Sequence, residues 1–288
     1  MDRLKIAIQK SGRLSDSSIK LLNGCSLSFQ RGKQKLIAPC AKFSADILYL
    51  RDDDIPQYVA DGVADLGILG LNVVKEKEKH VQIEKYLGFS NCRLSLAVPK
   101  DADYHCVKFF DGKRIATSYP KLTKKYLASK GVKAEIHEIS GSVEIATGIG
   151  LADGICDLVS TGGTLLSNGL KEVDSVLESE AVLITNPQLN GAKQRLVDQL
   201  LFRIEANLKA KKFKYILMNA PNDQVKNIVN VLPGMKSPTV LPLANGEWSS
   251  IHTVIEEEAY WNILEKLKGY GIEAVSYTHL TLPTNREV

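Results

Sequence analysis

A cluster of hydroxyl side chains and glycines follows a short apolar segment near the middle of the chain. Residues 155–159 form the apolar segment and include one acid, Asp157. The cluster that follows consists of Ser160, Thr161, Gly162, Gly163 and Thr164. Glycines permit a turn in which successive backbone N–H groups face one point, and Asp157 can accept hydrogen bonds from sugar hydroxyls. The stretch predicts a site for a phosphorylated sugar, although such clusters are more often plain loops.

A second candidate for anion binding lies near the start of the chain. Residues 4–8 read as an apolar strand, and a helix is expected near residues 15–22. Lys10, Gly12 and Arg13 lie between them. Helix N-termini favour anions, and the two basic residues add positive charge. The alternative is a solvated turn, because the spacing of a Walker sequence is absent.

Three consecutive acids follow another expected strand, which ends at Arg51. Asp52, Asp53 and Asp54 precede a helix that is expected to end at Gly62. Asp54 suits the N-cap of that helix, and acids suit its positive end. Three adjacent carboxylates could instead hold Mg²⁺.

The chain contains an internal repeat of eleven residues. Residues 60–70 align with residues 152–162, and six of the eleven pairs are identical. Each copy reads as a helix end, a short strand and a glycine turn. A repeat at this distance indicates two similar lobes with a cleft between them, where small ligands usually bind.

Strands and helices alternate through the first two thirds of the chain. Among the helices, one is expected to begin with Ser118 as its N-cap and Pro120 in its first turn, and another to run from Gly141 to Leu151. This alternation predicts an α/β fold with ligand sites at the carboxyl ends of strands. After a long helix at residues 192–211, the order changes to β-α-β-β-α-β, which is ferredoxin-like.

Composition and charge exclude several classes of protein. The net charge of +4 is mild, and no concentrated basic stripe indicates a nucleic-acid partner. No segment approaches the length of an apolar membrane span, and the first residues do not form a secretion signal. The five cysteines lack the spacing of a metal or redox pair. We expect a cytoplasmic protein without a membrane partner.

Several motifs, in order, resemble ATP phosphoribosyltransferase, the enzyme of the first committed step in histidine biosynthesis. They lie at residues 8–14, 51–56, 65–68, 92–95, 114–120 and 157–164, and residues 232–239 resemble its long form. The resemblance runs from about Arg3 to Val275. It implies two lobes like a periplasmic binding protein and a C-terminal ACT-like regulatory domain. The expected bounds are 1–93 with 187–212 for lobe I, 94–186 for lobe II and 213–288 for the regulatory domain.

The resemblance also implies a reaction and a set of roles. N1 of ATP attacks C1 of 5-phosphoribosyl 1-pyrophosphate and expels pyrophosphate, with Mg²⁺ as cofactor. Residues 160–164 would cradle the 5-phosphate, and Asp157, with Asp153, would face the ribose. Lys10, Gly12 and Arg13 would meet the phosphates of pyrophosphate or ATP. Arg51 and the segment Thr117, Ser118 and Tyr119 would line the nucleotide side. No general-base pair is evident, and the catalytic residues and metal ligands are not identified.

Regulation is expected in the third domain. By the resemblance, histidine inhibits from a site between subunits of a homo-oligomer, a hexamer built from dimers. Its candidate residues are Asn219, Leu232, Gly234 and Thr239.

The end of the chain departs from the family pattern. From Ser276 to Val288 the sequence lacks the expected aliphatic run, and Pro283 and Asn285 disfavour a central strand. We expect a non-native tail here, which weakens the prediction of a last strand.

Two other functions share the expected architecture. A non-catalytic solute-binding protein would have the same lobes, but the missing signal peptide and the third domain argue against it. A regulatory subunit that binds ligand without turnover is disfavoured by the intact loop at residues 160–164.

Overall fold

The computed structural model describes residues 3–30, 35–232 and 237–279. The chain folds as two compact units. The first contains Met1–Lys20 and Phe29–Gln194, and the second contains Leu21–Ser28 and Arg195–Val288. No helix in the described part of the chain is long and apolar enough to cross a membrane.

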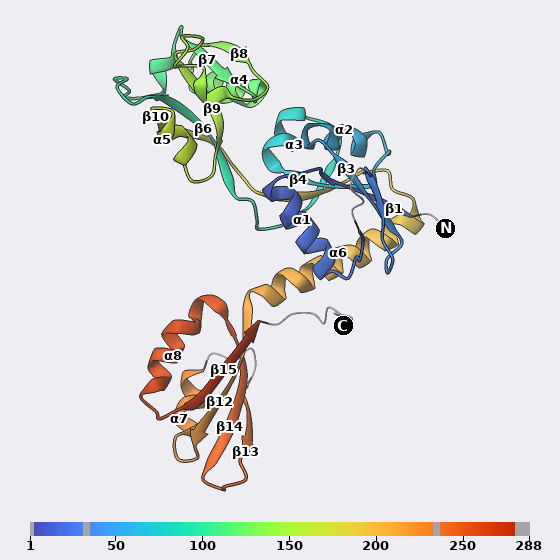
Figure 1. Cartoon of the computed structure of the whole chain (residues 1–288), viewed down its shortest axis with the longest axis vertical. Coiled ribbons are helices and arrows are strands. Elements are labelled where there is room, and N and C mark those ends of the chain that lie inside the picture. Colours follow the sequence, from blue (N-terminus) through green and yellow to red (C-terminus); the bar gives the residue numbers. More distant parts are fainter. Residues whose placement is uncertain (1–2, 31–34, 233–236, 280–288) are drawn as a thin grey trace. The chain divides into compact units, whose positions relative to one another are not determined.

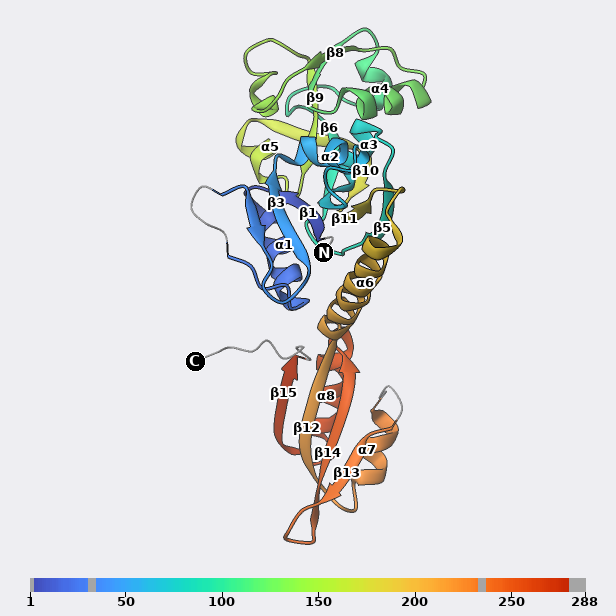
Figure 2. The same cartoon turned by 90° about the vertical axis from the view of Figure 1, so that its right-hand side faces the viewer.

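The first lobe of unit one is built on a six-stranded sheet, drawn mainly in blue in Figures 1 and 2. Its strands, in spatial order, are β2 (Ile37–Pro39), β3 (Ala45–Leu50), β1 (Leu4–Gln9), β4 (Leu66–Gly70), β11 (Ala181–Thr185) and β5 (Gln82–Tyr86). The central strands β3, β1 and β4 run parallel, and their side chains are largely buried. Three helices belong to this part of the chain: α1 (Arg13–Gly24), α2 (Ile55–Ala60) and α3 (Leu71–Lys77).

The second lobe carries a five-stranded sheet. Its spatial order is β10 (Leu170–Ser179), β6 (Cys92–Pro99), β9 (Gly154–Val159), β7 (Arg114–Thr117) and β8 (Glu135–Glu138). Two helices accompany it: α4 (Pro120–Ser129) and α5 (Gly163–Ser167). A short 3-10 turn, Val143–Ile145, stands where the sequence predicted a helix reaching Leu151. The helix is prevented from extending by glycines at positions 148 and 150, the second of which has a positive φ of 75°.

The chain returns to the first lobe earlier than predicted. β11 pairs with β4 and β5 of the first sheet, so the second lobe ends before Ala181 and not at residue 186. β11 is buried at every position, which suits an inner strand of that sheet.

The second unit combines the short segment Leu21–Ser28 with most of a long helix and a small C-terminal domain. Helix α6 (Gly191–Lys211) has Val197, Leu200 and Ile204 fully buried. Arg203 donates a hydrogen bond to the carbonyl of Cys25 at 3.2 Å, which ties α6 to the segment Leu21–Ser28. From Arg195 onward the helix therefore belongs to the second unit, whereas the sequence had placed all of residues 187–212 with lobe I.

The small domain has the predicted ferredoxin-like order. Its strands and helices are β12 (Phe213–Pro221), α7 (Val225–Val231), β13 (Thr239–Pro242), β14 (Trp248–Glu256), α8 (Tyr260–Lys268) and β15 (Glu273–His279). All strand pairs are antiparallel in the order β13-β14-β12-β15. Alternate residues of β12 are buried against the helices, as period-two patterning requires.

The last strand extends further than the sequence predicted. β15 continues through Ser276 to His279 and pairs with β12, with Tyr277 opposite Ile216. The strand lies at an edge of the sheet, where the sequence pattern is less restrictive. Pro283 and Asn285 lie outside the described residues.

Candidate active site

A pocket of about 300 Å³ lies in the first unit and is lined by both lobes. The first lobe contributes Gly12, Arg13, Asp52 and Asn72, and the second contributes Leu158 and Ser160. The crossover between the lobes adds Ser90, Asn91 and Cys92. The pocket therefore brings together two of the predicted loops, which are separated by almost 150 residues of sequence.

The basic loop reaches the pocket through Gly12 and Arg13. Gly12 has a positive φ of 98°, a conformation that glycine adopts without strain, and α1 starts at the next residue. The Arg13 guanidinium donates to Ser160 Oγ at 3.4 Å, which links the two lobes. The first turn of α1 lies at the pocket wall, so its free N–H groups favour an anion there. Lys10 is exposed and does not line the pocket.

The hydroxyl and glycine loop turns sharply after β9. Gly162 has a positive φ of 80° and precedes the short helix α5. Ser160 lines the pocket, while Thr161, Gly163 and Thr164 are exposed on the same turn. Their donor groups are open to a ligand, as the sequence-based interpretation requires.

Two acids near the candidate site carry perturbed carboxyl groups: Asp52 lines the pocket, whereas Asp157 does not line it but precedes the lining residue Leu158. Burial raises the pKa of Asp157 on β9, and the nearby charge of Glu144 adds to the effect. Burial also raises the pKa of Asp52, and the adjacent Asp53 contributes in the same direction. Both carboxylates are therefore less stable as anions than exposed ones, and each would gain from a hydrogen-bond donor or a cation supplied by a ligand.

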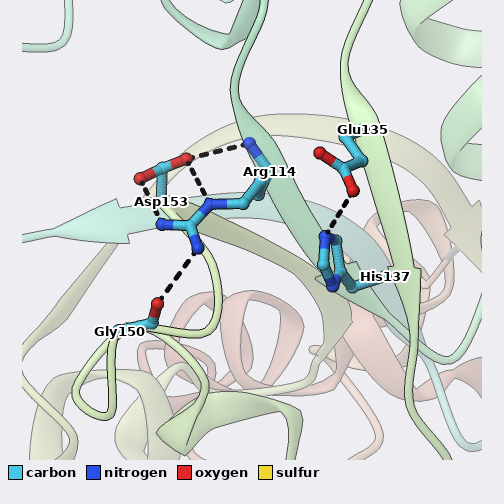
Figure 3. A network of polar contacts seen from close by, with 5 residues as sticks. All are labelled: Arg114, Glu135, His137, Gly150 and Asp153. Atoms are coloured by element: carbon cyan, nitrogen blue, oxygen red, sulfur yellow. Dashed lines mark hydrogen bonds and ion pairs between the residues drawn. The ribbon is translucent and has the colours of Figure 1, made fainter.

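Asp153 does not face the pocket, contrary to the prediction for it. Its carboxylate accepts from the backbone N–H of Arg114 at 2.9 Å and from the Arg114 guanidinium at 3.2 Å (Figure 3). Arg114 also donates to the carbonyl of Gly150. The hydrogen bonds from Arg114 to Asp153 hold the pKa of that carboxyl below its usual range. Asp153 therefore anchors the start of β9 to β7 and is occupied by that structural role.

Asp65 plays the same part in the first lobe. Its carboxylate accepts from the backbone N–H of Lys5 at 2.8 Å, just before β4 pairs with β1. Asp153 stands in the corresponding place before β9 pairs with β7. The sequence alignment had paired Asp65 with Asp157, so the repeat is four residues out of register with the structural correspondence. Within the part of the chain that the structure describes, Asp157 makes no such contact between strands, and its carboxylate accepts from the backbone N–H of the pocket-lining residue Leu158 at 2.8 Å.

The segment at residues 117–119 is only partly as predicted. Thr117 is buried, and its hydroxyl accepts from the backbone N–H of Tyr119 at 2.9 Å. Ser118 does not cap α4, because its hydroxyl donates to the carbonyl of Ile139 and Tyr119 stands at the N-cap position. The Tyr119 hydroxyl accepts from Asn72 Nδ2 at 2.9 Å, across the two lobes. Burial raises the pKa of Tyr119, with a contribution from Asp52.

The acidic triplet forms a 3-10 turn, Asp52–Asp54, and Arg51 is exposed outside the pocket lining. Asp54 occupies the predicted N-cap position of α2 but makes no capping hydrogen bond through its side chain. Within the described residues, no group of three or more His, Cys, Asp or Glu side chains is arranged to hold a metal. Asp52, which faces the pocket, is the member of the triplet that can reach a ligand.

Sequence reasoning missed a polar group at the crossover. Asn72 is buried, and its backbone N–H and side-chain oxygen both bond Ser179 Oγ, at 3.0 and 2.8 Å. Ser90 and Asn91 precede β6 and line the same pocket. No local pattern distinguishes these residues in the sequence, because only the pairing of the lobes brings them to the pocket.

Glu76 makes a further contact between the lobes. This residue of α3 is buried, and its two carboxylate oxygens accept from the backbone N–H groups of Lys121 and Leu122, each at 2.9 Å. These N–H groups lie in the first turn of α4, where no partner exists within the helix. Glu76 thus caps a helix of the opposite lobe.

The residues predicted to form the inhibitor site differ in whether their side chains are available to a ligand. Leu232 is buried in the core of the small domain, packed with Ile228 and Ile251, so its side chain is not available to a ligand. Asn219 is half-buried on β12 and Thr239 is exposed on β13. Gly234 lies outside the described residues.

Comparison with known proteins agrees with this architecture. The family model "ATP phosphoribosyltransferase" matches residues 51–206, and the model "HisG, C-terminal domain" matches residues 210–281. The ATP phosphoribosyltransferase of Cytophaga hutchinsonii is 52% identical over 285 residues, which cover 99% of this chain and 98% of that protein. The enzyme of Bacteroides fragilis is 50% identical over 285 residues, covering 99% of both chains.

Solved structures similar to this chain point to a wider fold class. A chain of the ATP phosphoribosyl transferase (HisG:HisZ) complex from Thermotoga maritima aligns with a TM-score of 0.63 and 32% identity, covering 72% of this chain and 98% of that chain. The substrate-binding protein of an amino acid ABC transporter aligns with a TM-score of 0.50 and 13% identity, covering 73% and 94%. This second likeness concerns the fold alone. With matched models over most of its length and relatives at half identity, the chain belongs to the ATP phosphoribosyltransferase family and is a long-form member of it.

Proposed function

We propose that the pocket between the lobes is where this enzyme passes the phosphoribosyl group of 5-phosphoribosyl 1-pyrophosphate to N1 of ATP. The observation that carries the assignment is the contact of Arg13 with Ser160. It places the basic start of α1 beside the hydroxyl and glycine loop, so two groups suited to phosphates share one pocket. A substrate with phosphates at both ends of a ribose matches two such groups.

The residues suggest a division of roles. Ser160, Thr161 and the N–H groups of Gly162, Gly163 and Thr164 are proposed to hold the 5-phosphate, with Asp157 accepting from the ribose hydroxyls. Gly12, Arg13 and the first turn of α1 are proposed to hold the pyrophosphate. Their positive potential would stabilise the charge that develops on pyrophosphate as its bond to C1 breaks. Lys10 and Arg51 would act, if at all, from outside the pocket lining.

Orientation of the two substrates is the remaining contribution expected from the protein. The attacking N1 must lie in line with the bond to the leaving group, and holding two reactants in such a geometry supplies much of the rate enhancement in reactions of this kind. Asn72, Ser90 and Asn91 are the polar groups proposed to orient the purine, because they line the pocket and remain after the phosphate-binding roles are assigned. Tyr119 supports Asn72 through their hydrogen bond.

Mg²⁺ is proposed as the cofactor, and the residues fit it. Mg²⁺ usually binds one or two carboxylates together with substrate phosphates and retains several waters. Asp52 faces the pocket with a carboxyl group whose pKa is raised by burial and by Asp53, so a cation there would relieve an existing cost. The ion would supply positive charge to the pyrophosphate.

Histidine is proposed as a feedback inhibitor that binds the small domain. The support is the match of residues 210–281 to the C-terminal family model, together with the half-buried position of Asn219 and the exposed position of Thr239. A homo-oligomer, a hexamer built from dimers, and a cytoplasmic location are proposed with it. All five cysteines are free thiols, as a reducing compartment would keep them.

The assignment is tested with the purified chain, ATP, 5-phosphoribosyl 1-pyrophosphate and Mg²⁺. The expected result is formation of phosphoribosyl-ATP, followed by absorbance, and its reduction in Ser160→Ala. Lys108→Ala, an exposed change in the same lobe, serves as the control and should leave the rate unchanged. Full activity of Ser160→Ala together with Thr161→Ala would move the site away from this pocket.

A further inference from the structure

A second pocket, of about 370 Å³, lies where α3 and the segment after it meet α4. It shares no residue with the pocket of the candidate active site. Both lobes line it: Lys75 and Lys79 come from the first lobe, and Lys121 and Lys125 from the second. Nothing in the transfer reaction requires these residues.

The lining is strongly cationic. Four lysines meet there with one acid, Glu78. Lys121 is paired with Glu78 at 3.1 Å, and Lys75, Lys79 and Lys125 form no ion pair within the described part of the chain. Lys121 and Lys125 are four residues apart on α4, a spacing at which like charges on a helix face repel, and Lys79 follows the end of α3. The pocket therefore has an unbalanced positive charge that a bound anion would relieve.

The floor of the pocket is apolar. Val74 is buried, and Val81, Ile83 and Leu122 are half-buried beneath the lysines. Low-dielectric walls around a set of like charges strengthen their field on a ligand and raise its local concentration. The same walls distinguish this pocket from a solvated row of lysines on a convex surface.

Glu76 decides which groups can hold the anion. Its carboxylate occupies the backbone N–H groups of Lys121 and Leu122, so the start of α4 has no free donors there to offer. Binding must then come from the ammonium groups. Lysine ammonium groups act as point charges toward phosphate, without the fixed two-pronged geometry of arginine, and the ligand's charge matters more than its exact shape.

We propose that this pocket binds a small polyanion of the polyphosphate class, such as a metabolite with two or more linked phosphates. One negative charge would leave most of the lysine repulsion in place, whereas three or four would neutralise it. Because lysines of both lobes contact the ligand, it binds best when α3 and α4 face each other as they do here. Such a ligand shifts the lobes toward this arrangement.

The test uses isothermal titration calorimetry of the full-length protein with inorganic tripolyphosphate. The parent is expected to show two binding events, one at the active-site pocket and one at the lysine pocket. Lys79→Ala combined with Lys125→Ala should weaken one event by about tenfold and reduce its dependence on salt, since screening acts on exposed charges. Lys42→Ala combined with Lys124→Ala is the matched control, because it removes one exposed lysine from each lobe outside both pockets.

Hydrogen exchange supplies a second readout. Tripolyphosphate should increase the protection of the Lys121 and Leu122 amides in the control variant and much less in the Lys79→Ala and Lys125→Ala variant. Equal binding by both double variants would overturn the proposal, and so would a hexaglutamate peptide that binds more tightly than tripolyphosphate. The proposed active site is tested separately by adding Arg13→Ala to the Lys79→Ala and Lys125→Ala variant. The binding event that survives in the double variant should then be lost, and its persistence would contradict the active-site assignment while leaving the lysine pocket untouched.

Discussion

Arg13 and Lys10 belong to one loop, yet the structure separates their roles. Arg13 lines the pocket and reaches Ser160, whereas Lys10 is exposed beside it. Removing a donor to a charged phosphate costs about 1.5–3 kcal/mol, or roughly 10- to 150-fold in rate. We therefore expect Arg13→Ala to lower kcat/KM by that factor and Lys10→Ala to lower it by less than about threefold. Steady-state kinetics check this, with thermal melting to show that both variants stay folded; equal losses would contradict the assignment.

Gly162 is needed for its backbone conformation. With φ at 80°, a side chain at this position is strained by about 1–2 kcal/mol. Gly162→Ala should therefore lose that much stability and also raise KM for 5-phosphoribosyl 1-pyrophosphate. Gly131 has φ at 68° and open space around it, outside the pocket, so Gly131→Ala is the matched control. The two variants should show similar shifts in melting temperature, and KM should change in Gly162→Ala alone. An unchanged KM in Gly162→Ala would argue against a role of the loop in binding.

Asp157 shows a conflict between stability and function. Its folded-state pKa is raised, so the folded protein binds more protons than the unfolded chain between the two values, and stability falls as pH rises through that window. Asp157→Asn should therefore unfold at higher urea concentration than the parent at pH 7.5. The difference should shrink toward pH 4, and kcat/KM should fall by roughly tenfold or more from weaker contacts with the ribose. A variant that is less stable at pH 7.5 would show that the charged form is favoured by the fold.

At the scale of elements, the contact of Glu76 with α4 holds the second lobe against the first. The two N–H groups that it caps lie in the first turn of α4, whose N-cap residue, Tyr119, bonds Asn72 at the pocket. Packing at the start of α4 and polar order in the pocket are therefore linked by a short chain of contacts.

Glu76→Ala should test that link. Loss of two charge-assisted hydrogen bonds from a buried carboxylate should lower the free energy of unfolding of the first unit by about 2–4 kcal/mol. Substrate KM should also rise, because the lobes are less well held. Glu78→Gln, two residues further on, removes an exposed ion pair and should cost less than about 1 kcal/mol. Urea unfolding followed by kinetics compares them, and equal effects of the two changes would leave Glu76 without a special role.

At the scale of the whole molecule, the small domain is a separable addition. The Thermotoga maritima chain is matched over 98% of its length by 72% of this chain, so a family member exists at about the size of the first unit with α6. The α6 helix carries the contact with Cys25, so a shortened chain that keeps this helix keeps that contact too.

Histidine inhibition should depend on the small domain. A chain ending at Lys211 should retain transferase activity and lose inhibition by histidine, because linkage requires a site that binds the two functional states differently. In the full chain, Asn219→Ala should weaken inhibition, and Asn227→Ala, an exposed change on α7, should not. Inhibition assays and calorimetry with histidine measure this. Persistent inhibition of the shortened chain would place the regulatory site in the first unit.

Most strands and helices, and the α/β class of the fold, could be predicted from local sequence patterns, although the helix predicted at residues 141–151 is a 3-10 turn. Leu4–Gln9 and Gly154–Val159 could be recognised as strands because they are short, largely apolar segments bounded by turn residues. Gly12 and Gly162 indicated turns because glycine readily adopts a positive φ. The β-α-β-β-α-β order of the small domain was likewise readable from local patterns. These features depend on interactions between residues close together in the chain.

Which polar groups meet depends on contacts between distant segments and could not be predicted from local patterns. Asp153 and Asp157 look alike in the sequence, but pairing of β7 with β9 gives Asp153 to Arg114 and leaves Asp157 near the site. Contacts between the lobes give Asn72, Glu76 and Ser90 their positions. The place of β11 in the first sheet was equally hidden, because the strands with which it pairs lie more than 90 residues earlier in the chain. Such contacts leave no local signal, because they are fixed by the packing of distant segments.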